Sequence, residues 1–360
     1  MFITDFRPLP PRPSLEQYKK QAKDLLKAFR ASDPDVVERI TKFLPQNSQR
    51  LTLTGAQLVV AREHGFASWR RFAAYVQAVG YRNSPTAAFE LAADAIPQGE
   101  ADVLRHLIGS NPGLVRERSM RTHSATLLHY TAANGVEDYR QKTPPNIAVI
   151  AAELLQSGTE IDAIANIYGR SATLSLAASS VHPQLAGVQI ALLELLLERG
   201  AAIDGPPGSA NPTLAALRNG RGDAASFLAS RGAALDLESA AGTGHIDTVR
   251  AILTSGSATG DQHAAGLAWA CQYGHTEVVE YLLDAGSDPN GMYERNAPLH
   301  WAAVGAQSEV ARLLLEYGAN PRALNRYGAM PVGQAQWSAS HDGRPERFDV
   351  IIEVLTAAET

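Results

Sequence analysis

Two short polar stretches carry the side chains of this 360-residue chain that are best suited to chemistry. Arginines lead up to a histidine in the first stretch, and a tyrosine stands beside two bases in the second. These residues are Arg116, Arg118, Arg121 and His123, followed by Tyr139, Arg140 and Lys142. Arginine binds carboxylate or phosphate oxygens through paired hydrogen bonds. The stretches therefore predict a basic pocket for a carboxylate or a phosphate, that is, for an anionic small molecule.

A third polar stretch, which contains His182 and Gln189, extends the set. The candidate binding residues of the pocket are Arg118, Arg121, Arg140, Lys142 and Gln189. His123, Tyr139 and His182 are the candidates for acid–base catalysis, because a histidine titrates near neutral pH and a tyrosine can donate a proton. No Ser-His-Asp order, Cys-His pair or His-Glu-x-x-His spacing supports a named mechanism. Whether the chain is an enzyme stays open, and we favour binding.

A plainer interpretation of the same residues also stays open. The loops that carry them can pack on each other and on the front of the chain, with the arginines in solvent or paired to Glu117, Glu137 and Asp138. An aromatic series offers a similar choice. Tyr130, Trp269 and Trp301 occupy equivalent positions in three similar segments, where they either grip a ligand or pack between layers of helices.

Composition narrows the classes of function. The net charge is −5 and the pI is near 6.1, which argues against a nucleic-acid partner. Cys271 is the only cysteine, so no disulfide and no thiolate metal site forms within the chain, and we expect no metal and no cofactor. The first residues have no signal-peptide pattern, and no apolar run is long enough to cross a membrane. We expect a cytoplasmic protein without a membrane partner.

Internal repetition is the strongest pattern in the sequence. The segments 244–256 and 274–286 both begin with Gly-His, continue with apolar residues at helical spacing, and end with glycine. In the second segment, Val278, Val279, Leu282 and Leu283 form one apolar stripe. The closing glycine is typical of a left-handed helix cap, and such glycines or an asparagine recur at Asn111, Gly158, Gly200, Gly232, Gly256, Gly286 and Gly318.

Segments upstream of these glycines carry a second recurring motif. They read Leu-Leu-His-Tyr-Thr-Ala-Ala at 127–133, Thr-Leu-Ser-Leu-Ala-Ala at 173–178 and Pro-Leu-His-Trp-Ala-Ala at 298–303. These resemble the Thr-Pro-Leu-His-x-Ala-Ala signature of the ankyrin family, whose period is about 33 residues. The resemblance implies an all-α ankyrin-repeat solenoid of about seven repeats including caps, two of them with insertions. It also implies that His129 and His300 tie adjacent repeats together by hydrogen bonds.

The front of the chain differs from the repeats. Ser14, Asp33 and Ser68 are placed to cap helices, and a further helix is predicted from Thr54 to His64. We predict an extended arm at 1–13, a helical module at 14–80, ankyrin repeats at 84–330 and capping helices at 331–360. A terminal repeat needs a closing layer, and we expect the last open face to be covered by Val350, Ile351, Val354 and Leu355. The module and the two insertions resemble a bacterial subgroup of ankyrin-repeat proteins.

Two functions follow as hypotheses. The first is a non-catalytic module that binds another protein through the concave face and the turn tips of the repeats, since such surfaces are rigid and extended. The second is a small-molecule-binding protein or an enzyme that uses the basic pocket of the two inserted loops. The discriminating observation is whether His123, Tyr139, Arg140 and His182 converge on one enclosed cavity.

Overall fold

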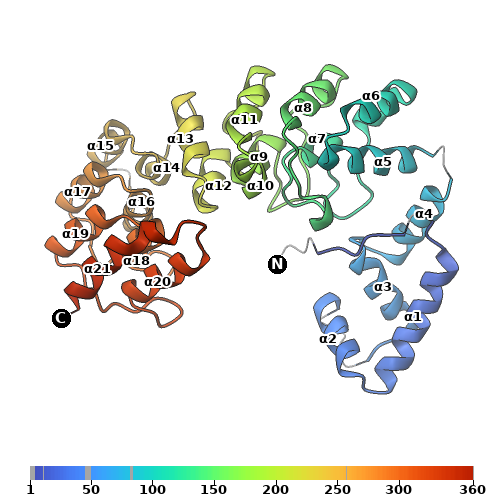
Figure 1. Cartoon of the computed structure of the whole chain (residues 1–360), viewed down its shortest axis with the longest axis horizontal. Coiled ribbons are helices and arrows are strands. Elements are labelled where there is room, and N and C mark those ends of the chain that lie inside the picture. The colour runs from blue at the N-terminus through green and yellow to red at the C-terminus, as the bar shows by residue number, and fades with distance from the viewer. Residues whose placement is uncertain (1–4, 11, 45–49, 82–83, 257, 360) are drawn as a thin grey trace. The chain divides into compact units, whose positions relative to one another are not determined.

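The computed structural model describes residues 5–10, 12–44, 50–81, 84–256 and 258–359. The chain divides into two compact units, Met1–Ala215 and Ala216–Thr360, and each is described by itself. Both units consist of helices joined by short turns (Figure 1). Within the described ranges, β pairing is limited to two isolated bridges, Ala165 with Ser171 and Tyr293 with Asn296. None of the helices in these ranges is both long and apolar enough to span a membrane.

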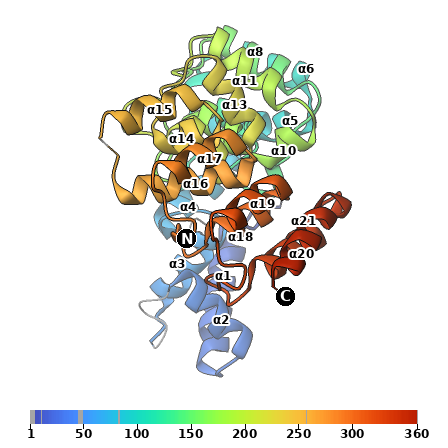
Figure 2. The same ribbon diagram turned by 90° about the vertical axis from the view of Figure 1, so that its left-hand side faces the viewer.

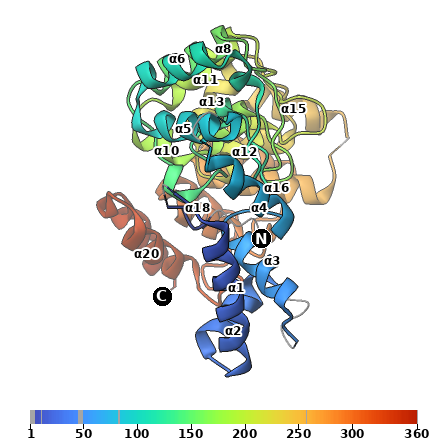
Figure 3. The ribbon, with the colours of Figure 1, turned by 90° about the vertical axis from the view of Figure 1, so that its right-hand side faces the viewer.

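Four helices open the first unit and share one apolar core (Figure 3). They are α1 (Leu15–Arg30), α2 (Pro34–Phe43), α3 (Leu53–Glu63) and α4 (Trp69–Val79). Asp33 and Ser68 accept hydrogen bonds from backbone N–H groups at the starts of α2 and α4, which confirms two predicted caps. Ser14 occupies the cap position before α1, as predicted, but its side chain makes no capping hydrogen bond. The third helix begins at Leu53, one residue earlier than predicted.

The segment before α1 is anchored to the end of α3. The backbone N–H of Arg7 donates to the carbonyl of Glu63 at 2.8 Å, and His64 Nδ1 donates to the carbonyl of Arg7 at 2.7 Å. Phe6 is buried against Gly65, where an added Cβ would lie 3.1 Å from the Phe6 ring and where the φ of +84° is one that other residues rarely adopt. This segment belongs to the predicted arm, of which residues 1–4 and 11 lie outside the described residues.

The rest of the first unit stacks helices in two rows. One row contains α5 (Pro85–Gln98), α7 (Leu127–Tyr130) and α9 (Thr173–Ser179); the other contains α6 (Ala101–Ser110), α8 (Ile147–Gln156) and α11 (Gln189–Glu198). The predicted insertions separate the members of two pairs. A loop with a 3-10 turn at Asp138–Arg140 joins α7 to α8, and α10 (Val181–Leu185) lies between α9 and α11.

The second unit also has helices in two rows, and its arrangement is more regular (Figure 2). Its pairs are α14 (Leu237–Gly242) with α15 (Ile246–Thr254), α16 (Gly260–Tyr273) with α17 (Thr276–Asp284), α18 (Pro298–Gly305) with α19 (Ser308–Glu316), and α20 (Pro331–His341) with α21 (Asp349–Ala358). Helix α13 (Gly222–Ser230) precedes them, and α12 (Pro212–Arg218) contains the boundary between the units. Successive first helices contact each other, as do successive second helices.

Local sequence explains this stacking. The predicted stripe on α17 is buried, and Gly286 after it has a φ of +93°, as a left-handed cap requires. The His300 ring accepts from the backbone N–H of Ala297 through Nδ1 and donates to the carbonyl of Ala329 through Nε2 at 3.0 Å. This bond joins α18 to the turn of the next repeat and confirms the role that the ankyrin resemblance implies for His300.

The last helix pair covers the end of the second unit. Ile351 and Leu355 are buried as predicted, and Val354 is partly buried against the same core. Val350 is half exposed, so the prediction that it belongs to the covering face is wrong. Phe348, in the turn before α21, takes that place in the core.

Candidate functional site

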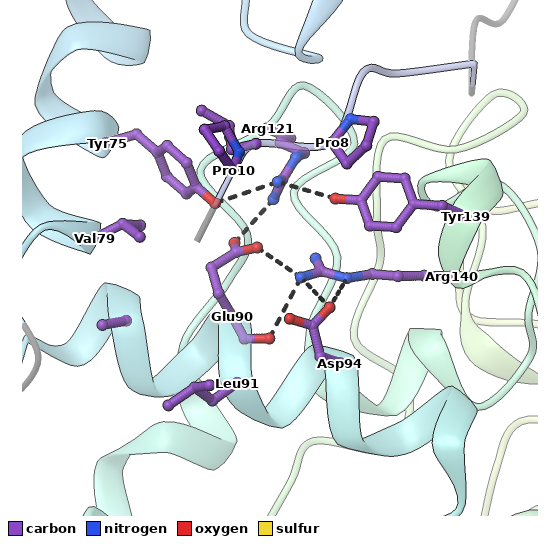
Figure 4. A pocket seen from close by; sticks show the side chains of 12 residues that line it. Pro8, Pro10, Tyr75, Val79, Glu90, Leu91, Asp94, Arg121, Tyr139 and Arg140 are labelled. Carbon is purple, nitrogen blue, oxygen red and sulfur yellow. Dashed lines mark hydrogen bonds and ion pairs between the residues drawn. The ribbon is translucent and has the colours of Figure 1, made fainter. Parts of the chain in front are cut away.

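A cavity of about 680 Å³ lies in the first unit, beneath the N-terminal arm (Figure 4). Its apolar wall is formed by Pro8, Leu9, Pro10, Val79, Ala87 and Leu91. Its polar wall is formed by Tyr75, Glu90, Asp94, Arg121, Tyr139 and Arg140. The volume lies within the range of small-molecule sites. The arm, α4, α5 and both predicted polar stretches therefore contribute to one cavity.

Arg121 lies at the centre of the polar wall and is buried. Its Nη1 donates to Glu90 Oε1 at 2.8 Å, and its Nη2 donates to the hydroxyls of Tyr75 and Tyr139 at 3.2 and 3.4 Å. Its Nε lies 2.9 Å from Glu137 Oε1. The guanidinium thus contacts four side chains of the protein itself.

Arg140, in the inserted loop between α7 and α8, is held in the same way. Its Nε donates to Asp94 Oδ1 at 2.8 Å, its Nη2 donates to Glu90 Oε2 at 2.9 Å, and its Nη1 donates to Glu137 Oε1 at 3.3 Å. Glu90 therefore accepts from both arginines, one through each carboxylate oxygen. Such charge-assisted bonds in a buried place are the stronger kind of hydrogen bond.

Glu137 contacts both arginines but does not itself line the cavity. Besides the two arginines, it accepts a bond from the Tyr130 hydroxyl at 3.4 Å. Burial alone would raise the pKa of Glu137, but Arg121 and Arg140 outweigh burial and hold it well below the ordinary value of 4.5. The same balance holds the pKa of Glu90 below its ordinary value. Both carboxylates are therefore charged at neutral pH.

The charges of the site do not add up to a basic pocket. Glu90, Asp94 and Glu137 carry three negative charges against the two positive charges of Arg121 and Arg140. The pairing of both arginines with Glu137 agrees with the plainer interpretation of the inserted loops. The predicted cavity is present, but its two arginines already pair with carboxylates of the protein itself.

His123 lies behind the cavity and is fully buried. Its Nδ1 accepts the backbone N–H of Ala125 at 3.1 Å, so the proton of the neutral ring is on Nε2, which lies 3.6 Å from Glu137 Oε1. A ring in this arrangement has no open position for a substrate. Tyr139, the second predicted catalytic residue, lines the cavity and keeps its hydroxyl proton for another acceptor, because it accepts from Arg121.

The remaining predicted residues lie apart from the lining of this cavity. His182 is partly exposed on α10, and Lys142 is exposed after the 3-10 turn. Arg118 donates to the carbonyls of Ser124 and Ile164 at 3.1 and 2.8 Å. The amide of Gln189 is buried and donates to three carbonyls, those of Ala177, Ala178 and Ser180.

The aromatic series is buried at all three positions. Tyr130, in the first unit, contacts Phe89 edge to face at 6.2 Å between ring centroids. Trp269 and Trp301, in the second unit, lie 5.3 Å apart, and Tyr293 contacts both. These contacts fit the interpretation that the aromatic side chains pack between helices.

Sequence reasoning missed Tyr75, Glu90 and Asp94. A usable signal exists for two of them: Glu90 and Asp94 are four residues apart, on one face of a helix that is otherwise rich in alanine. Nothing in the sequence pairs that face with residues 121 and 140. In the described part of the chain, no three His, Cys, Asp or Glu side chains gather in a way that could hold a metal ion.

Helices in two rows, left-handed caps and a histidine bonded to the next turn define the fold, which is an all-α ankyrin-repeat solenoid. A family model described as ankyrin repeats, three copies, matches residues 237–325. Among solved structures, the chain is similar to the crystal structure of the human ASB11 ankyrin repeat domain. That likeness has 23% identity and a TM-score of 0.34, and covers 66% of this chain and 99% of the other. No curated protein sequence matches the chain.

Proposed function

We propose that the protein binds another protein, and that the turn tips and the adjacent helix face of the second unit form the binding surface. The observation that carries this proposal is a set of large apolar side chains in two consecutive turns and on the helix α20 that follows them. Met292, Leu324, Tyr327 and Trp337 are each more than half exposed. Water-exposed apolar groups gathered on one region of a surface are typical of protein interaction sites.

The turns that carry these side chains are connected to each other. The backbone N–H of Arg326 donates to the carbonyl of Arg295 at 3.1 Å, and Asn290 bonds the backbone of both Gly318 and Asn320. Within the later turn, Asn325 also donates to the side chain of Gln334 on α20. Trp337 follows Gln334 by one helical turn and so lies on the same side of α20. A surface fixed in this way loses little conformational entropy on binding.

Charge indicates the chemistry of the partner. Arg295, Arg322 and Arg326 are exposed in these turns, together with the carboxylates Asp288 and Glu294. A partner segment with apolar side chains flanked by Asp or Glu would complement this surface. The overall net charge of −5 gives no support to a nucleic-acid partner.

The test is a capture experiment that compares variants. The double variant Leu324→Ala, Tyr327→Ala should lose the captured partner by roughly tenfold or more, the effect typical of central interface residues. Tyr81→Ala, at an exposed position in the first unit, is the matched control and should retain the partner. A protein captured equally by the wild type and both variants would contradict the proposed surface.

The cavity in the first unit supports a second candidate function, a site for a small molecule. Its volume and its mixture of apolar and polar walls are those of a ligand site. We keep open whether a reaction takes place there. Tyr139 is the one predicted catalytic residue that lines the cavity.

We also propose an origin, a location and a division of the chain from its sequence. The resemblance of the front module and the insertions supports a bacterial origin and membership of the subgroup named above. We place the protein in the cytoplasm and divide it into an arm at 1–13, a module at 14–80, ankyrin repeats at 84–330 and capping helices at 331–360.

A further inference from the structure

We propose that the cavity beneath the N-terminal arm binds an organic cation, an amine or a guanidine attached to an apolar body, with Asp94 as its counterion. This inference rests on the second candidate function and names its ligand class. It replaces the anion that the arginine-rich sequence suggests. The ligand class depends on which polar groups of the cavity are already bonded within the protein and which can still bond a ligand.

The positively charged side chains of the cavity are already bonded to other side chains of the protein. Arg121 and Arg140 direct their N–H groups at Glu90, Glu137, Asp94 and two tyrosine hydroxyls, all within 3.4 Å. A carboxylate or phosphate ligand would have to replace these internal partners. Because Glu90 and Glu137 are buried, displacing them would leave their charges without a counterion, which is costly.

The free charge is negative. Two arginines face three carboxylates, so the cluster has an excess of one negative charge. Glu90 and Glu137 are buried between the arginines, whereas the side chain of Asp94 is 46% exposed. Asp94 meets Arg140 through Oδ1 alone (Figure 4), which leaves Oδ2 free to accept from a ligand.

The surroundings of Asp94 suit a cation with an apolar body. Val79 and Leu91 stand across the cavity from Tyr139 and Arg140 (Figure 4), and Leu91 is 55% exposed although it is large and apolar. The Tyr139 ring already has the guanidinium of Arg140 over it at 5.3 Å, so its surroundings accommodate positive charge. A ligand amine at Asp94 would place its carbon chain on Leu91 and Val79.

The arm forms the remaining wall. Leu9 is half-buried, and Pro8 and Pro10 line the cavity beside it. The anchoring bonds of Arg7 to Glu63 and His64 hold the start of this segment in place. A ligand with an apolar body would therefore be covered on one side by Leu9.

Three probes with the same apolar body test the proposal. We would titrate 4-phenylbutylamine, 5-phenylpentanoate and 4-phenylbutanol, which all carry a phenyl ring on four methylene groups, into the full-length protein by calorimetry at pH 7 and low salt. The amine should bind at least roughly tenfold more tightly than the alcohol or the carboxylate, as expected for one charge-assisted contact. Leu9→Ala should weaken the binding of all three probes.

Two variants test the role of charge. Asp94→Asn should reduce amine affinity roughly tenfold and leave alcohol affinity unchanged. Leu91→Lys, at an exposed position, should abolish amine binding and favour the carboxylate. Asp102→Asn, on the exposed face of α6, is the matched control and should bind like the wild type.

Each remaining outcome has a defined meaning. Tighter binding of the carboxylate than of the amine would overturn the cation proposal while leaving a ligand site in place. Failure of all three probes at millimolar concentration would overturn both the ligand class and the second candidate function. Equal amine affinity in the wild type and in Asp94→Asn would remove Asp94 from the site.

Discussion

Glu137 contacts several charged side chains, and its position in the sequence alone does not indicate these contacts. It is fully buried, forms ion pairs with Arg121 and Arg140 and accepts a hydrogen bond from Tyr130, with the His123 ring beside it. Removing one member of a buried ion cluster leaves the others without compensation, whereas removing a surface pair has little effect. Stability of the first unit should therefore depend on this single carboxylate.

Glu137→Gln tests that dependence. We expect the free energy of unfolding to fall by about 3 kcal/mol, because two buried guanidinium groups lose a shared counterion. Urea unfolding followed by the fluorescence of Trp69, the only tryptophan of the first unit, would measure the change. Asp102→Asn, which removes an exposed ion pair with Arg105, should leave the curve nearly unchanged. An unaltered curve for Glu137→Gln would show that the cluster contributes nothing to stability.

His129 gives the protein a dependence on pH. Burial lowers its pKa to about 3, from an ordinary value of 6.5, so the folded protein keeps the ring neutral while the unfolded chain takes up a proton below pH 6.5. The stabilising contribution is therefore complete above pH 6.5 and is lost as pH falls from 6.5 towards 3. The slope per histidine is about 1.4 kcal/mol per pH unit.

The variant His129→Asn should reduce this slope. Between pH 6 and 5, its unfolding free energy should fall less steeply than that of the wild type, by roughly the contribution of one proton. The carboxylates Glu90 and Glu137 do not interfere, because their lowered pKa values place their effect below 4.5. Parallel pH profiles for the two proteins would mean that His129 is protonated in the folded state.

At the scale of elements, neighbouring helices approach each other so closely that only small residues fit at their contact. Gly305 on α18 lies so near the carbonyl of Gln272 on α16 that an added Cβ would overlap it. A backbone carbonyl within a helix cannot move aside as a side-chain end can. The Ala-Ala and glycine positions of the repeat motif therefore fix the distance between neighbouring first helices.

Two glycine substitutions separate this packing effect from helix propensity. Gly305→Ala should lower the unfolding free energy of the second unit by about 2 kcal/mol, the cost of overpacking. Gly333→Ala, on α20, meets only Ala329 at 3.8 Å and should raise stability by up to about 1 kcal/mol, because alanine favours the helix. Thermal unfolding would report both changes. Stabilisation by both substitutions would contradict the close contact at Gly305.

The elements themselves follow closely from sequence, for a physical reason. The stripe of α17 and the glycine after it act locally, and local patterns determine a helix and its end. The bond from His300 to Ala329 could be expected because the repeat motif recurs in register. Val350 and Phe348 show the limit: which of two nearby apolar residues is buried depends on the turn before α21.

The cavity followed from sequence only in part. The loops that contain Arg121, Tyr139 and Arg140 were expected to converge, and these residues do line one cavity. Its charge was expected to be basic because the stretches around these residues are rich in arginine. The acidic partners Glu90 and Asp94 come from α5, which is remote in sequence, and a contact between distant segments leaves no local pattern.

At the scale of the whole molecule, the two units support different kinds of binding. The first unit contains a cavity with apolar and polar walls, and the second exposes apolar side chains. Regular repeats can carry equivalent side chains at successive turns, which builds an extended surface for a protein. In the first unit, the arm, α4, α5 and the loops with Arg121 and Arg140 instead surround a small volume. Our central proposal is that the second unit binds another protein.

Photo-crosslinking at a single residue tests this claim most directly. A benzoylphenylalanine would replace Tyr327 at a turn tip or, in a separate variant, Glu309 on the outer helix α19, both of which are exposed. We predict a discrete crosslinked protein from position 327 that is absent from position 309 and is diminished when Leu324→Ala is added. The same crosslinked species from both positions, or none from position 327 in cells that contain the full-length protein, would contradict the account.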